Sequence, residues 1–99
     1  MLVVTGTMRV PDGAIDEMKT ACATMARKTR QEAGCLDYAF WQNVEDPCEF
    51  RVYEEWRDLD CLKAHGKADH MEVYRDKLKQ ISVTGRDINL YDPGPATKL

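Results

Sequence analysis

The stretch Phe50-Arg51-Val52-Tyr53-Glu54-Glu55-Trp56 decides the fold of this chain. Successive side chains of a β-strand point to opposite sides of a sheet, so this stretch divides into two faces. We therefore predict a strand over 49–56 that is half buried. One face combines three large apolar side chains with a carboxylate, and it carries Phe50, Val52, Glu54 and Trp56.

The rest of the chain predicts three more strands and two helical regions. Apolar alternation and turn residues favour strands at 2–10, 35–42 and 87–91, and a polar turn at 43–47 favours a hairpin. Apolar residues three and four apart predict helices at 14–32, 59–65 and 68–79, with a break at Gly66 and a left-handed cap at Gly34.

The order β-α-β-β-α-β predicts a single α+β domain over residues 1–99 with the ferredoxin-like arrangement. Right-handed crossovers place the helices on one face of a four-stranded antiparallel sheet. The other face is too aromatic to be left in water, so we expect a homodimer through this open face. Residues 92–99 are expected to form a loose tail or to lie on the partner. The open face carries Val3, Thr5, Trp41, Tyr53 and Tyr91.

Composition excludes several functional classes. The net charge of −3 gives no basic surface for nucleic acid, and no polybasic or long apolar segment indicates a membrane. No secretion signal is recognised, so a cytoplasmic location is expected. The four cysteines form no C-x-x-C pair and are expected to be reduced, structural thiols.

Two histidines close to the Trp-ending strand are the candidates for chemistry. His65 and His70 titrate near neutral pH and could act as general bases. Five residues on one helix differ by about 140° in direction, but a break at Gly66 could bring both to a cleft between sheet and helices. Such a cleft suits a small aromatic ligand. We expect side chains from the sheet and the helices to line this cleft, namely Tyr38, Phe40, Phe50, Val52, Trp56 and Tyr74.

Structural roles compete with each of these assignments. A histidine at a helix end often caps or hydrogen-bonds, and Trp56 could simply pack in the core. For Glu54 a salt bridge is favoured over catalysis, because a buried carboxylate needs a partner. No phosphate-binding loop, nucleophile elbow or His-x-x-x-His pair is present, so neither a metal nor a cofactor is predicted.

Four segments together resemble the antibiotic biosynthesis monooxygenase family, most of all its quinol monooxygenase branch. They are Glu32–Tyr38, Phe50–Trp56, Leu62–His65 and Asp69–Met71, the last followed by Tyr74. The resemblance implies a dimeric ferredoxin-like α+β barrel. It also implies oxidation of hydroquinones or polycyclic phenols by dioxygen, without metal, flavin or haem.

The resemblance also implies roles for residues. His65 or His70 would assist deprotonation of the substrate, and Tyr38 and Tyr74 would orient its oxygens. Aromatic walls would come from Phe40, Phe50 and Trp56. A haem-degrading relative is not indicated, because strand one has Thr5-Gly6-Thr7 where such members have an Asn.

Two other functions stay open. One is a non-redox isomerase of a small phosphorylated or polar substrate, with Lys63, Lys67 or Arg75 as an oxyanion clamp. The other is a non-catalytic dimer that binds an aromatic ligand.

Overall fold

The computed structural model describes all 99 residues and contains one four-stranded sheet covered by helices. The elements are β1 (Leu2–Arg9), a 3-10 turn η1 (Asp12–Ala14), α1 (Ile15–Thr29), β2 (Cys35–Asn43), β3 (Asp46–Trp56), α2 (Leu59–Gly66), α3 (Asp69–Gln80) and β4 (Thr84–Tyr91).

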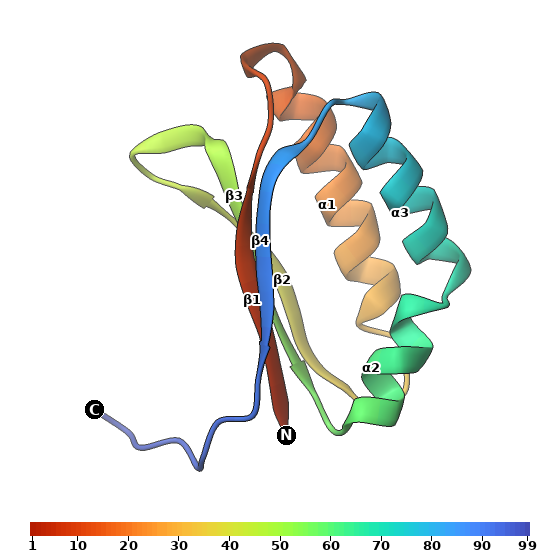
Figure 1. Ribbon diagram of the computed structural model, residues 1–99, viewed down its shortest axis with the longest axis vertical. Helices are drawn as coiled ribbons and strands as arrows, with labels where there is room; N and C mark the ends of the chain where they lie inside the picture. The colour runs from red at the N-terminus through yellow and green to blue at the C-terminus, as the bar shows by residue number, and fades with distance from the viewer.

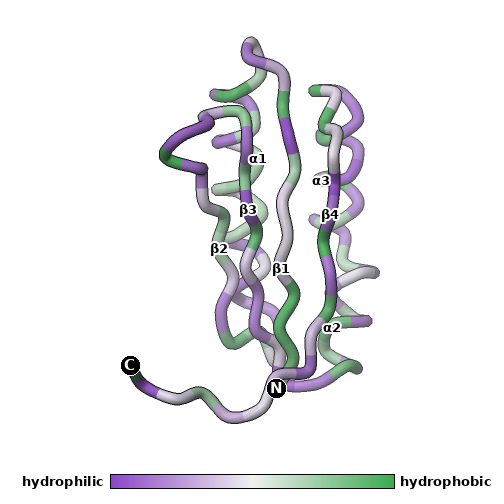
Figure 2. Tube along the Cα trace, turned by 60° about the vertical axis from the view of Figure 1, so that its left-hand side comes forward, coloured by the Kyte–Doolittle hydropathy of each residue, from purple (hydrophilic) through white to green (hydrophobic).

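The strands pair antiparallel in the order β2-β3-β1-β4. All three helices lie on one side of this sheet, and the opposite face is uncovered (Figures 1 and 2). The predicted ferredoxin-like fold is confirmed, with its second helical region split into α2 and α3. The chain after β4 runs away from the sheet without regular structure (Figure 1).

The end of α1 differs from the prediction in a way that matters for the site. The helix stops at Thr29 rather than at residue 32, and a tight turn carries the chain into β2. Gly34 has the expected left-handed backbone, with φ of 78°. A side chain at Gly34 would also collide with Cys61 of α2. This glycine therefore lets the turn that contains Glu32 pack closely against α2.

Strand boundaries shift because backbone pairing extends beyond the alternating side chains. β3 begins at Asp46 and β4 at Thr84, which pairs with Arg9. Leu36, which strict alternation would place on the same face as Tyr38 and Phe40, is instead 55% exposed. The register shifts between Cys35 and Asp37, and this irregularity turns Leu36 out of the core.

The core fills the space between the sheet and the helices. The predicted apolar stripe of α1 is buried at Met18, Cys22 and Met25, against Trp56 and Tyr38 from the sheet. All four cysteines are free. Even α1, the longest helix at 15 residues, is too short and polar to span a lipid bilayer.

Candidate functional site

A cavity of about 200 Å³ lies between the inner face of the sheet and the two C-terminal helices. Its walls are mainly apolar, and a few polar groups converge on it, as expected of a small-molecule site. Five of the eight predicted site residues line it: Tyr38, Phe40, Val52, His65 and Tyr74. The other lining residues are Val4, Met8, Glu54, Leu62, Gly66, Met71, Arg86 and Ile88.

His65 is the imidazole of this cavity. It lies near the end of α2 and is only 3% exposed. Its Nδ1 is 2.7 Å from Oε2 of Glu32, and its ring lies 4.8 Å from the Trp56 indole, measured between centroids. A carboxylate beside Nδ1 favours the tautomer with the proton there, which leaves a lone pair on Nε2. Burial lowers the pKa of His65, while Glu32 opposes that shift.

His70 reaches the same carboxylate from the other side. It lies in the first turn of α3, and its Nε2 is 2.8 Å from Oε2 of Glu32. The extended backbone at Ala68, with ψ of 144°, separates α2 from α3 and permits this convergence. Both histidines therefore approach one carboxylate. α2 includes Gly66, and the break between the helices falls at Lys67 and Ala68 rather than at the glycine. His70 nevertheless does not line the cavity.

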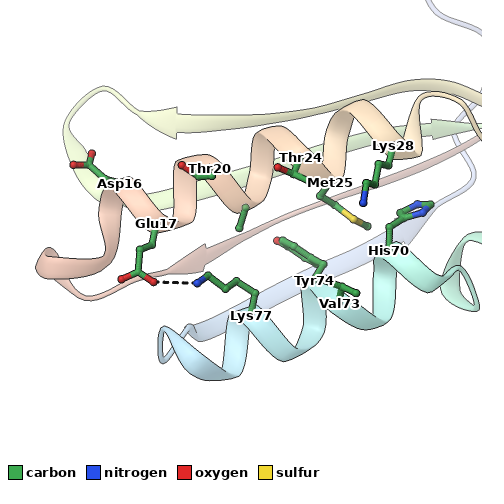
Figure 3. A pocket seen from close by; sticks show the side chains of 11 residues that line it. Asp16, Glu17, Thr20, Thr24, Met25, Lys28, His70, Val73, Tyr74 and Lys77 are labelled. Carbon is green, nitrogen blue, oxygen red and sulfur yellow. Dashed lines mark ion pairs between the residues drawn. The ribbon is translucent and has the colours of Figure 1, made fainter.

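A second hollow, of about 460 Å³, is an open groove between α1 and α3 (Figure 3). His70 and Lys28 lie at one end, and the Glu17–Lys77 ion pair of 3.3 Å lies at the other. Tyr74 borders both this groove and the cavity. Polar residues make up most of the residues that line this groove, whereas apolar residues make up most of those that line the smaller cavity, and His65 lies among them. The smaller cavity is therefore the better candidate for chemistry on an aromatic ligand.

Glu32, His65 and His70 bring one carboxylate oxygen and two ring nitrogens within 4.8 Å of one another. The sequence pattern does not predict this grouping, because Glu32 is 33 residues from His65 and follows no spacing rule. Carboxylate and imidazole are donors that zinc accepts. In this structure both nitrogens lie at hydrogen-bond distance from the shared oxygen, so hydrogen bonding accounts for the cluster.

Glu54 differs from its expected role. No Lys or Arg forms an ion pair with it, so the predicted salt bridge is wrong. Its Oε1 instead accepts a hydrogen bond of 2.8 Å from the indole Nε1–H of Trp56. Burial raises the pKa of Glu54 to about 7, and the indole hydrogen bond opposes this shift.

Two predicted wall residues do not reach the cavity. Trp56 is fully buried beneath His65 and acts on the cavity only through that ring and through Glu54. Phe50 lies further along the inner face, beside Cys22 and Ala26 of α1. Alternation placed both residues on the correct face, but it could not place them along the length of the strand.

The two predicted tyrosines keep their protons. Burial raises the pKa of Tyr38 and of Tyr74 far above the usual range. Tyr38 packs edge-on against His65 and Phe40, at 5.6 Å between ring centroids in each pair. The Tyr74 hydroxyl is 3.7 Å from the sulfur of Met8. Both phenols therefore remain hydrogen-bond donors at neutral pH.

Glu32 and Arg86 belong to the site but do not stand out in the sequence pattern. Glu32 lies in one of the segments that resemble the family, but the helical pattern predicts only that it ends a helix. Arg86 was overlooked because the last strand was predicted to begin at residue 87, whereas β4 begins at Thr84. Its position two residues before Ile88, on the same face of a longer strand, is the signal that could have identified it.

Comparisons with known proteins agree on one family. The family model described as "Antibiotic biosynthesis monooxygenase" matches residues 1–77. YcnE of Bacillus subtilis strain 168, provisionally named a monooxygenase, is 22% identical over 88 residues, which cover 89% of this chain and 93% of that protein. An uncharacterized protein of Synechocystis sp. is 23% identical over 90 residues, 91% of this chain. The chain spans only 61% of the length of that relative.

A solved structure from Deinococcus radiodurans, provisionally named an antibiotic biosynthesis monooxygenase, superposes with a TM-score of 0.95. It is 27% identical, and the match covers 100% of this chain and 98% of that one.

Proposed function

This chain belongs to the antibiotic biosynthesis monooxygenase family, and on that premise we propose that it is a cofactor-independent monooxygenase acting on a hydroquinone or related phenol. The observation that carries the proposal is His65, buried at the cavity with a carboxylate on its Nδ1. Ligand pockets for drug-sized molecules measure about 300–1,000 Å³, so a cavity of about 200 Å³ favours a small, single-ring substrate over a polycyclic one.

The reaction begins with proton transfer. Nε2 of His65 takes a hydroxyl proton from the substrate, and Glu32 stabilises the imidazolium that results. The phenolate is electron-rich enough to pass electrons to dioxygen. Hydroquinone and dioxygen then give a hydroxyquinone and water: one oxygen atom enters the ring as a hydroxyl group, and the other leaves as water. The substrate supplies all four electrons, so no outside reductant is consumed.

The remaining residues bind and shield the substrate. Phe40 and Val52 supply apolar walls that exclude water and protect reactive intermediates. Tyr38 and Tyr74, which stay protonated, donate hydrogen bonds to substrate oxygens. His70 is a positioning residue, because it holds the Glu32 carboxylate on which His65 depends.

We also propose that the protein acts as a homodimer through the open face of the sheet. Trp41 is 62% exposed and Tyr91 is 51% exposed on or beside this face, an apolar surface that monomers rarely leave in water. The elution mass at micromolar concentration tests this proposal, and a clean monomer would contradict it.

Oxygen uptake with a panel of hydroquinones tests the monooxygenase proposal. We expect His65→Gln to lower kcat/KM by about 10²–10⁴-fold, the usual contribution of a general base. Lys79→Gln, at an exposed position of α3, is the matched control and should retain activity. Uptake that does not exceed autoxidation with any hydroquinone would contradict the proposal.

Arg86 at the cavity favours a second candidate, an isomerase of a phosphorylated substrate, because a guanidinium binds phosphate well. Arg75, the clamp considered from sequence, donates instead to the backbone carbonyl of Gly66, at 2.8 Å. Turnover without oxygen would favour the isomerase. Binding of an aromatic ligand without any turnover would favour a binding protein.

A further inference from the structure

The cavity contains a second ionisable group that the mechanism above does not use. Glu54 projects from the middle of the sheet and is only 6% exposed, yet no cation pairs with it. Burying a carboxyl group that has no cationic partner is costly, and an apolar residue here would pack at lower cost. Because this carboxyl lies in the wall of the cavity, we expect a ligand that forms a hydrogen bond with it.

The hydrogen bonding of Glu54 leaves one oxygen for such a ligand. Oε1 accepts the indole proton of Trp56, and that indole is fixed because it is fully buried. Oε2 makes no hydrogen bond within the protein and is not among the fully buried unpaired atoms, so it retains accessible surface. Glu54 lines the cavity, and this surface is the one that a substrate hydroxyl can reach.

Charged and titratable groups approach Glu54 from several elements. The pKa of about 7 reflects burial above all, with an added contribution from the charge of Glu32. A pKa in the neutral range lets the carboxyl accept a proton at physiological pH, as a general base should. The surrounding titratable groups are Tyr38 and Cys35 of β2, His65 of α2, Tyr74 of α3, Arg86 of β4 and Glu32 in the turn after α1.

We propose that Glu54 is the second proton acceptor of the cavity, and that the substrate is a para-dihydroxy aromatic compound with one hydroxyl at His65 and the other at Glu54. This inference rests on the proposed function and narrows its substrate class. The two hydroxyl hydrogens of a hydroquinone leave as protons, one to Nε2 of His65 and one to Oε2 of Glu54. Both end in the water formed from dioxygen, while the displaced ring hydrogen ends on the new hydroxyl group.

Binding under argon tests the site without turnover. Calorimetry at pH 8 compares hydroquinone with 4-methylphenol, in which a methyl group of similar size replaces one hydroxyl. We expect the unmodified protein to bind hydroquinone about tenfold more tightly, the value of a hydrogen bond to a charged group. Glu54→Gln, which keeps an acceptor for the indole, should reduce this preference to within about twofold. Glu55→Gln, the adjacent carboxylate on the opposite face, is the matched control and should retain it.

The pH dependence of binding distinguishes an ionised carboxylate that accepts a hydrogen bond from a group in the cavity wall that is polar but does not ionise. Lowering the pH from 8 to 6 protonates Glu54 and should weaken the preference for hydroquinone in the unmodified protein and in Glu55→Gln. The preference in Glu54→Gln should not change with pH. A circular dichroism melt shows that each variant is folded before it is compared. An unchanged preference in folded Glu54→Gln, or no binding of hydroquinone to the unmodified protein, overturns the inference.

Oxygen uptake distinguishes the two proposals from each other. If hydroquinone is oxidised, kcat/KM should fall on the acid side of about pH 7, and this fall should disappear in Glu54→Gln. Equal rates and equal pH profiles in both proteins would overturn the role of Glu54 while leaving the monooxygenase proposal intact. A preference that depends on Glu54 without any oxygen uptake would support the site and contradict the monooxygenase proposal.

Discussion

The two faces of β3 present the same residue types in opposite environments. Glu54 on the inner face is buried and hydrogen-bonded to an indole, whereas Glu55 on the outer face accepts a hydrogen bond of 2.6 Å from the Tyr53 hydroxyl. Burial raises the pKa of Glu54 to about 7. On the outer face, the hydrogen bond to Glu55 raises the pKa of Tyr53 to about 12. One residue step along the strand thus separates a carboxyl suited to proton transfer from one that serves as a surface acceptor.

The two tryptophans repeat this contrast. Trp56 is fully buried beneath His65, and Trp41 on β2 is largely exposed on the open side of the sheet. The Trp56 indole fills the core and also orients two titratable groups, His65 and Glu54. The inner face therefore contributes both to the stability of the fold and to the candidate chemistry. The outer face adds little to the stability of a single chain and is available for association.

Replacing Trp56 should have the largest effect. Trp56→Ala removes a completely buried aromatic ring and should lower the free energy of unfolding by about 3–5 kcal/mol. It also leaves Glu54 without its hydrogen-bond donor. Urea denaturation measures the loss. A loss below about 1 kcal/mol would mean that the inner face is not the main core.

The pH dependence of stability should reveal the difference between the two glutamates. The folded pKa of Glu54 is raised from 4.5 to about 7, so its protonated form stabilises the fold. This contribution is fully present below about pH 4.5 and is lost as pH rises through about 7. At 1.36 kcal/mol per pKa unit, the loss is ~3 kcal/mol.

The measurement compares unfolding of the unmodified protein with that of Glu54→Gln and Glu55→Gln between pH 4.5 and 8. His65, whose pKa is lowered by burial, contributes the opposite slope, since its neutral form is favoured as pH rises through its folded pKa to 6.5. Both variants retain His65, so the difference between them isolates the glutamates. Only Glu54→Gln should remove the decrease in unfolding free energy that Glu54 causes as the pH rises. Identical plots of unfolding free energy against pH for the two variants would contradict the difference between the two glutamates.

Replacing Glu32 should have an intermediate effect, which we expect on the pKa of His65. Because its carboxylate raises the pKa of His65, Glu32→Gln should lower that pKa further. Titration of the imidazole proton signals by NMR measures this change. Asp60→Asn on the exposed side of α2 is the control and should leave the His65 pKa in place.

Replacing Trp41 should have the smallest effect on folding. Trp41→Ala at an exposed position should change the unfolding free energy of the monomer by less than about 0.5 kcal/mol. If the open face associates, the same variant should shift the elution mass toward the monomer. A loss of stability comparable with that of Trp56→Ala would contradict the distinction between the faces.

Alternation within β3 was sufficient to predict which face is buried, and helical spacing located the α1 stripe at Met18, Cys22 and Met25. These patterns succeed because the periods of strands and helices are local properties of the backbone. They failed at Leu36, where a shift in pairing with β3 turned the side chain outward. Such a shift depends on a second strand, which the local pattern does not contain.

The sequence by itself determined the order of elements, the buried face of β3 and the presence of two histidines near its end, because each follows from short-range periodicity. Only the tertiary structure decided that Glu32 joins the two imidazoles, that Glu54 binds an indole rather than a cation, and that Trp56 lies behind the cavity. Each of these depends on segments distant in sequence meeting in the folded core, or on how far along a strand the cavity extends. Local spacing specifies the direction of a side chain but not the group that it meets.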